Sequence, residues 1–278
     1  IESGFDSGVA GWSIAAGNYS SRFAPAVAGT AYLAASRLRD RLSRLACQHL
    51  NVATEKLEFA DGKIFSSDNP ANSVPFRRIA GSSHWSPGTL PEGLEPVVRE
   101  TATWTPPQLE APDASDRING ATAYGFIFDF CGVEVDRVTH HIRIDHYVTM
   151  HDAGRRINPA LLDGQIRGAF AHGIGAALFE RFRYDDDGQF LSGTFADYLV
   201  PTACEVPDPI ILHTESPSPF TPLGTKGAGE GQSMSTPVCI ANAVADALGV
   251  DDIELPLTPD RVAALMSDDE PSFRSAGA

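Results

Sequence analysis

The chain has 278 residues, of which 42% are hydrophobic, and a formal net charge of −15. An acidic chain of this kind repels phosphate backbones, so we expect no nucleic-acid partner. The sequence shows no apolar run as long as a membrane span and no signal peptide, so we expect a soluble, cytoplasmic protein. It starts at Ile1 rather than methionine, which predicts a processed or truncated chain with a partner piece elsewhere.

The four cysteines are widely scattered and contain no C-x-x-C pair, which excludes a sequence-local zinc or iron–sulfur cage. They are Cys47, Cys131, Cys204 and Cys239.

The N-terminal part combines a polar loop, a helix and a hairpin. The loop GNYSSR, Gly17 to Arg22, precedes an alanine- and leucine-rich stretch that predicts a helix from Pro25 to about Leu50. Such a loop is either an anion site at the helix N-terminus or ordinary capping by one of its serines. Asp61-Gly62 then predicts a hairpin, and we expect residues 66–120 to be an irregular connection.

The second part begins with strands and ends with helices. Two apolar stretches, Tyr124–Asp136 and His141–Asp152, predict a two-stranded hairpin. Helices are expected from Pro159 to near Glu180, from Ser235 to Gly249 and from Thr258 to Met266. The glycines of the first of these helices suggest close packing by a neighbour. We therefore expect an α+β fold with helices on mixed sheets, in two subdomains divided at 1–120 and 121–278.

Several common sites are disfavoured. Histidines 140, 141, 146 and 151 cluster in sequence, but strand positions five apart point to opposite faces, so solvated histidines are favoured over a metal site. The carboxylates 185–187 precede a glycine in a turn and lack the further ligands of a calcium loop. The sequence contains no phosphate loop of the G-x-x-x-x-G-K type and no G-x-S-x-G elbow.

The stretch GTKGAGEGQSMSTP, Gly224 to Pro237, is the strongest candidate for chemistry. Its glycines let the backbone approach a bound group closely, and Glu230 stands in the middle of the turn. One interpretation is a loop that holds a cofactor against a catalytic base, and the other is a surface loop with a solvated glutamate. Together with GNYSSR and the stretch Ile157–Gln165, it could wrap a phosphate-bearing cofactor.

These segments, in this order, resemble the large molybdenum subunit of the xanthine oxidase family, which includes aldehyde oxidoreductases and aerobic carbon monoxide dehydrogenases. The matching stretches are GNYSSRFAPAVAGTA, VEVD with HDAGRRINP, GQIRGAFAHGIGAALFE, and GTKGAGEGQSMSTPVCIANAVADALG. The resemblance runs from about Gly17 to Met266 and covers only the C-terminal part of that subunit. It implies a separately encoded half subunit or a fragment.

The resemblance implies roles for individual residues. Glu230 matches the family's general base, which we expect in a largely dry pocket. No side chain would bind the metal directly, because the pterin dithiolene holds molybdenum. The positions that the resemblance assigns to cofactor binding are Asn18, Tyr19, Ser20, Ser21, Arg22, Ile157, Asn158, Gln165, Lys226, Gly227, Ala228 and Gly229.

The implied activity is hydroxylation of an electron-poor sp² carbon of a small-molecule substrate, with water as oxygen source. The implied cofactor is molybdopterin with molybdenum, in the cytosine dinucleotide form. The implied partners are the N-terminal half of the molybdenum subunit, an iron–sulfur subunit with 2Fe-2S clusters and an FAD subunit. Aldehydes, N-heteroaromatics, aromatic acyl thioesters and carbon monoxide all stay open as substrates.

Three alternatives stay open. The first is a non-catalytic structural or assembly chain of the same fold, which the intact KGAGEG segment disfavours. The second is a reductive aryl-CoA-type member of the family. The third is an unrelated nucleotide-binding enzyme that uses the GNYSSR loop, which the missing phosphate-loop signatures disfavour.

Overall fold

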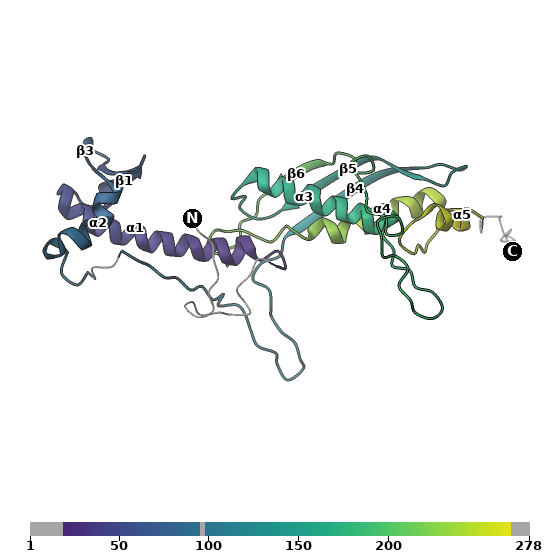
Figure 1. Ribbon diagram of the computed structural model, residues 1–278, viewed down its shortest axis with the longest axis horizontal. Helices are drawn as coiled ribbons and strands as arrows, with labels where there is room; N and C mark the ends of the chain where they lie inside the picture. The colour runs from purple at the N-terminus through teal and green to yellow at the C-terminus, as the bar shows by residue number, and fades with distance from the viewer. Residues whose placement is uncertain (1–18, 95–97, 268–278) are drawn as a thin grey trace, which may run out of the picture. The chain divides into compact units, whose positions relative to one another are not determined.

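The computed structural model describes residues 19–94 and 98–267, which form two compact units (Figure 1). The first unit is the described part of 26–107, and the second contains 19–25 with 108–267. The sequence predicts a single boundary near residue 120. The structure differs because the turn that contains Ser21 is hydrogen-bonded to residues of the C-terminal part of the chain and belongs with it.

The unit of residues 26–107 packs helices against a three-stranded antiparallel sheet of order β1-β2-β3. Asp61 and Gly62 have positive φ angles of 47° and 70° and join β1 to β2, which confirms the predicted hairpin. The predicted helix is also present, with its first turns in η1 (Phe23–Ala28). The other elements are α1 (Gly29–Leu50), η2 (Thr54–Lys56), β1 (Leu57–Ala60), β2 (Lys63–Ser66), β3 (Asn69–Pro75), α2 (Phe76–Trp85) and η3 (Pro87–Thr89).

The prediction that residues 66–120 are irregular is wrong at its start, because β3 and α2 lie there. The strand pattern is hidden because β3 is an edge strand that contains Pro70 and Pro75, and edge positions tolerate proline. The helix α2 is only 10 residues long and contains Gly81 and Ser82, which favour a loop over a helix in a reading of the sequence.

The second unit is built on a three-stranded sheet of order β4-β5-β6. Strands β4 (Phe126–Val135) and β5 (Ile142–Asp152) form the predicted antiparallel hairpin. Strand β6 (Ile210–Thr214) runs parallel to β5, so the sheet is mixed, as expected. A parallel neighbour requires a crossover connection, and the helix that follows β5 lies within it.

Helices cover one face of this sheet and form the core with it. Tyr147 of β5 lies 4.5 Å from Phe170 between ring centroids, and Ile240 is fully buried beside them. Among the described residues no helix is long and apolar enough to cross a membrane. The elements are α3 (Pro159–Ile174), η4 (Gly175–Phe179), α4 (Gly231–Leu248) and α5 (Pro259–Ser267).

Helix α4 begins four residues before its predicted start at Ser235, although it ends at Gly249 as predicted, with φ 71°. The prediction that Ser235 or Thr236 caps the helix is therefore wrong. The extra turn is stabilised because Gln232 is buried and accepts a 2.6 Å hydrogen bond from Thr236 Oγ1. Glu230 consequently occupies the N-cap position of α4.

Candidate functional site

The glycine loop is fixed to the carboxyl end of β5. Residues Gly154 and Thr225 form an antiparallel bridge, and the Lys226 N–H donates to the Ala153 carbonyl at 2.8 Å. Gly154 has φ 62°, and a Cβ there would lie 2.3 Å from the Gly224 carbonyl oxygen. Only glycine permits this approach. The loop therefore lies where parallel strands end, a common place for ligand sites in α/β sheets.

A buried ion pair holds the same loop. Lys226 Nζ lies 2.8 Å from Asp152 Oδ2 at the end of β5 and 2.6 Å from Ser216 Oγ, just after β6. Asp152 also accepts the N–H groups of Gly154 and Ser216. Burial acts to raise the pKa of Asp152, but the hydrogen bonds from Lys226 and Ser216 outweigh it and hold the pKa well below its usual range. The Lys226 ammonium group therefore binds partners within the protein, Asp152 and Ser216.

The Ser21 hydroxyl contacts Glu230 twice. It accepts a hydrogen bond from the Glu230 N–H at 3.0 Å and donates one to Glu230 Oε2, also at 3.0 Å. Ser20 and Ser21 both have left-handed backbone, with φ 53° and 54°, which forms the sharp turn that directs this hydroxyl. The turn and the glycine loop are therefore one structural site.

Gln165 of α3 completes this cluster. A Cβ built on Gly229 would lie 3.4 Å from Gln165 Oε1 and 3.6 Å from Ser21 Oγ. A Cβ on Gly227 would lie 2.8 Å from the Ser21 carbonyl oxygen. The three predicted segments thus meet at the two glycines, with Glu230 beside them.

The remaining predicted positions differ in what their side chains do. Asn158 is the N-cap of α3 and its Oδ1 accepts the Leu161 N–H at 3.1 Å. Ile157 is exposed, and the Arg22 guanidinium lies over the Tyr19 ring at 5.6 Å. Ala228 is half-buried in the glycine loop, and Asn18 lies outside the described residues.

A buried polar network beneath the loop is not evident from the sequence. Gln232 Nε2 donates to His151 Nε2 at 2.8 Å and to Asp129 Oδ1 at 3.1 Å. Burial lowers the pKa of His151 to about 4, so the ring is neutral at pH 7. A Cβ on Gly231 would lie 3.8 Å from His151 Cε1, which places the ring directly under the start of α4. The sequence indicates this network only through strand alternation, which places Asp129 of β4 and His151 of β5 on the inward face of the sheet.

The expected dry environment of Glu230 is not provided by the described residues, because its side chain is exposed. The site has a floor, made by β5 and α4, but the chain supplies no cover over the carboxylate within the residues that the structure describes.

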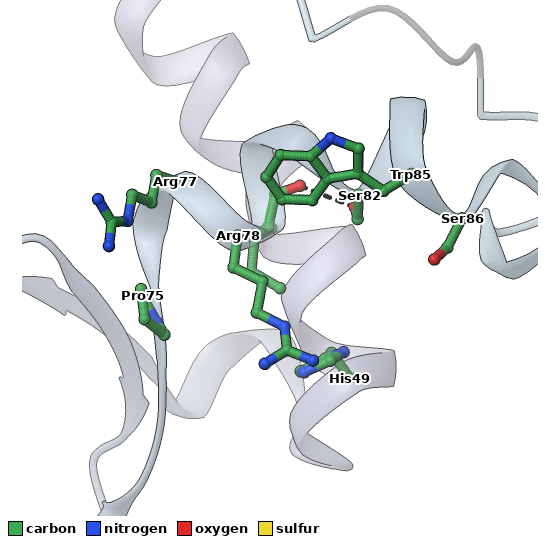
Figure 2. A pocket seen from close by; sticks show the side chains of 8 residues that line it. His49, Pro75, Arg77, Arg78, Ser82, Trp85 and Ser86 are labelled. Atoms are coloured by element: carbon green, nitrogen blue, oxygen red, sulfur yellow. Dashed lines mark hydrogen bonds between the residues drawn. The ribbon is translucent and has the colours of Figure 1, made fainter.

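A separate hollow of about 620 Å³ lies in the unit of residues 26–107. Figure 2 shows Arg78 pointing toward His49, and Trp85 also lines the hollow. Ser82 Oγ donates a 2.7 Å hydrogen bond to the Ile79 carbonyl oxygen. None of the predicted site residues lines it. The candidate site is therefore the cluster around Glu230.

Comparison with known proteins finds relatives over most of this chain. A model of the molybdopterin cofactor-binding domain family matches residues 3–207. The nicotine 6-hydroxylase large subunit of Paenarthrobacter nicotinovorans is 33% identical over 88% of this chain. The carbon monoxide dehydrogenase large chain of Hydrogenophaga pseudoflava is 29% identical over 88% of the chain.

Solved structures agree with these relatives. Quinoline 2-oxidoreductase from Pseudomonas putida 86 superposes with a TM-score of 0.74 at 35% identity, covering 90% of this chain and 30% of that one. A Cu,Mo-CO dehydrogenase superposes with a TM-score of 0.77 at 27% identity, covering 94% of this chain and 31% of that one. The chain also spans only 29% of the length of both curated relatives.

Proposed function

Because the chain belongs to the molybdopterin cofactor-binding domain family, we propose that it forms the C-terminal part of the large subunit of a molybdenum hydroxylase. The proposed reaction is hydroxylation of an electron-poor sp² carbon, with oxygen from water. The observation that carries the proposal is the convergence of Ser21, Gln165 and Glu230 at the glycines of the loop.

The residues present fit such a cofactor. At Gly229 the place of a Cβ is bordered by the polar atoms Gln165 Oε1 and Ser21 Oγ, at 3.4 and 3.6 Å. The exposed Gln165 amide offers both donors and an acceptor to the polar edge of a pterin. The first N–H groups of α4 lie beside Glu230 and favour negatively charged groups. The bound molybdenum–molybdopterin group would supply the two-electron redox chemistry.

Glu230 would act as the general base. Its Oε2 accepts from Ser21, which fixes the carboxylate in one orientation, while Oε1 has no hydrogen bond to the described residues and would accept the proton. A base is effective only when held within hydrogen-bond reach of the proton that it removes. The Ser21 contact and the Lys226–Asp152 pair would provide that placement from the two sides of the loop.

The first measurement that tests the proposal is molybdenum content, by elemental mass spectrometry, of the natively purified assembly. We expect about one molybdenum per copy of this chain, following the resemblance to molybdenum subunits. An assembly that stays intact without molybdenum would instead support a structural or assembly role for the chain. The cytosine dinucleotide form, the iron–sulfur and FAD partners, the cytoplasmic location and the substrate class remain predictions.

The second measurement is turnover of the Glu230→Gln variant, with aldehydes, N-heteroaromatics, aromatic acyl thioesters and carbon monoxide tested against an artificial electron acceptor. We expect normal molybdenum content and a loss of turnover of about 10²- to 10⁴-fold, the contribution of a positioned base. Glu134→Gln is the matched control, since that exposed carboxylate lies near the opposite end of β4. Near-normal turnover of Glu230→Gln would remove Glu230 from the mechanism.

A further inference from the structure

One face of the β4–β5–β6 sheet is apolar and exposed. The outward side chains of β4 are phenylalanines, with exposed fractions of 58% for Phe126, 57% for Phe128 and 69% for Phe130. On β6, Ile210 and Leu212 are about half exposed, at 52% and 49%. We call these five residues the β4–β6 face.

The strand register places these residues on one side of the sheet. Phe128 pairs with Met150, which pairs with Leu212. Phe130 pairs with Val148, which pairs with Ile210. Directly paired residues share a face, and residues one position along the strand lie on the other. The β4–β6 face is therefore opposite the face that α3 and α4 cover.

An exposed apolar face of this kind is unusual for a sheet with one side open to solvent. Antiparallel sheets with one solvated face alternate apolar and polar residues, whereas β4 carries apolar residues on both faces. β4 is also an edge strand, and among the described residues no strand pairs with its outer edge. Contiguous exposed apolar patches mark interaction sites.

The face is continuous with the candidate site. Gly125, just before β4, approaches the loop so closely that a Cβ there would lie 2.7 Å from the Gly227 carbonyl oxygen. The Phe126 ring at the end of the face lies 5.5 Å from Lys226 Nζ. A polypeptide on this face would therefore lie beside the loop that carries the exposed Glu230.

We infer that the β4–β6 face docks the polypeptide that corresponds to the part of the large subunit that this chain does not span, and that docking there encloses the Glu230 loop. The relatives' large subunits are about three times as long as the region that this chain matches, so a polypeptide large enough to cover the face exists in each of them. The apolar character of the face fits a permanent interface of this kind. The identity of the occupant rests on the proposed function; the docking itself rests on the exposed side chains.

A photo-cross-linking experiment tests the occupant directly. Phe128 is replaced with p-benzoylphenylalanine, which keeps the aromatic ring, and the natively purified assembly is irradiated and digested for mass spectrometry. We expect cross-linked peptides whose sequences match the unspanned part of the relatives' large subunits, on a separate chain or the same chain. The control is the same replacement at Phe195, which is 83% exposed and lies outside the sheet; it should give no such product.

Three results would overturn the inference: cross-links to a second copy of this chain, cross-links to an unrelated subunit, or no cross-link in an intact assembly. The cross-linking readout needs no molybdenum. The docking inference can therefore fail while Glu230→Gln still lowers turnover, and the expected cross-link can form while Glu230→Gln leaves turnover unchanged.

A charge on the face provides the second test. If the docked polypeptide is a separate chain, Phe128→Glu should weaken its association about 30-fold or more, as expected for a residue central to an interface. If it is part of the same chain, Phe128→Glu should instead increase the hydrogen exchange of the β4 amides. The side chain points outward, so circular dichroism of the variant should match the parent. Phe195→Glu should leave association unchanged. Unchanged association in a folded Phe128→Glu variant would also overturn the inference.

Discussion

The Ser21 hydroxyl binds both ends of Glu230, accepting from its backbone N–H and donating to its carboxylate, each at 3.0 Å. The two residues are 209 positions apart in the chain. The hydroxyl thus fixes the position of the backbone at the start of α4 and the direction of the carboxylate together. This contact makes the N-terminal turn part of the site.

The first prediction concerns this contact. Ser21→Ala removes both hydrogen bonds and frees the carboxylate, so kcat should fall about 10-fold, corresponding to roughly 1.4 kcal/mol for a hydrogen bond to a charged group. Turnover and molybdenum content of the natively purified assembly check it. Ser73→Ala is the control, since Ser73 is an exposed serine of β3 and is not one of the predicted site residues. A fully active Ser21→Ala variant would show that Glu230 needs no such support.

The second prediction concerns the ion pair beneath the loop. Lys226→Met leaves Asp152 buried without its cation, and the free energy of unfolding should fall by about 3–5 kcal/mol. Denaturant unfolding measures the change. Arg143→Met is the control in the same unit, because its pair with Glu134 is exposed to solvent and should contribute far less to stability. Equal losses in the two variants would contradict a special role for the buried pair.

The double variant Lys226→Met with Asp152→Asn separates charge from packing. It removes both charges, so it should recover part of the stability that Lys226→Met loses. No recovery would show that the loss comes from the packing of the lysine side chain instead.

The sequence is a good guide to the fold where side chains and backbone agree locally. The Asp61-Gly62 turn and the apolar strands β4 and β5 are local signals, and each is found where it was expected. The early start of α4 could not be predicted from the local sequence, because Gly229 and Gly231 disfavour a helix. It depends on Gln232, whose partners Asp129 and His151 come from two strands.

The candidate site likewise has features that the local sequence predicts and features that it does not. The glycine spacing around Glu230 is readable because backbone approach requires glycine. The Lys226–Asp152 pair joins residues 74 positions apart, and no local pattern connects them. The exposure of Glu230 could not be predicted either, since it depends on how segments distant in the sequence pack around the loop.

The third prediction concerns pH. The folded pKa of His151 is about 4, below the ordinary value of 6.5, so between these values the unfolded chain binds more protons than the folded one. Stability from the neutral ring is complete above about pH 6.5 and is lost as the pH falls toward 4. The loss amounts to about 3 kcal/mol at 1.36 kcal/mol per pKa unit.

Unfolding in denaturant at pH 7.0, 5.5 and 4.5 measures this loss, with His151→Gln as the comparison. Asp152 has a lowered folded pKa as well, so its contribution is present above the ordinary pKa of 3.8 and is lost only at lower pH. The two effects therefore separate by pH. A His151→Gln variant with the same pH dependence as the parent between 6.5 and 4.5 would exclude His151 as its source.

The last prediction compares two glycines of one helix, α3. A Cβ on Gly173 would lie 2.4 Å from Thr236 Cβ and 2.9 Å from the Gln232 carbonyl oxygen, whereas one on Gly168 would meet nothing within 4 Å. Gly173→Ala should therefore force α3 and α4 apart and lower the free energy of unfolding by about 1–3 kcal/mol. Gly168→Ala should raise it by up to about 1 kcal/mol, because alanine is the better helix former.

The two variants should change the free energy of unfolding in opposite directions. Because both add the same methyl group to the same helix, this difference separates the effect of packing from that of helix propensity. Denaturant unfolding of the two variants measures them side by side. If Gly173→Ala were also stabilising, the close contact between α3 and α4 could not exist in solution. Because α4 begins at the residue after Glu230, a shift of that helix should also reduce turnover in Gly173→Ala but not in Gly168→Ala.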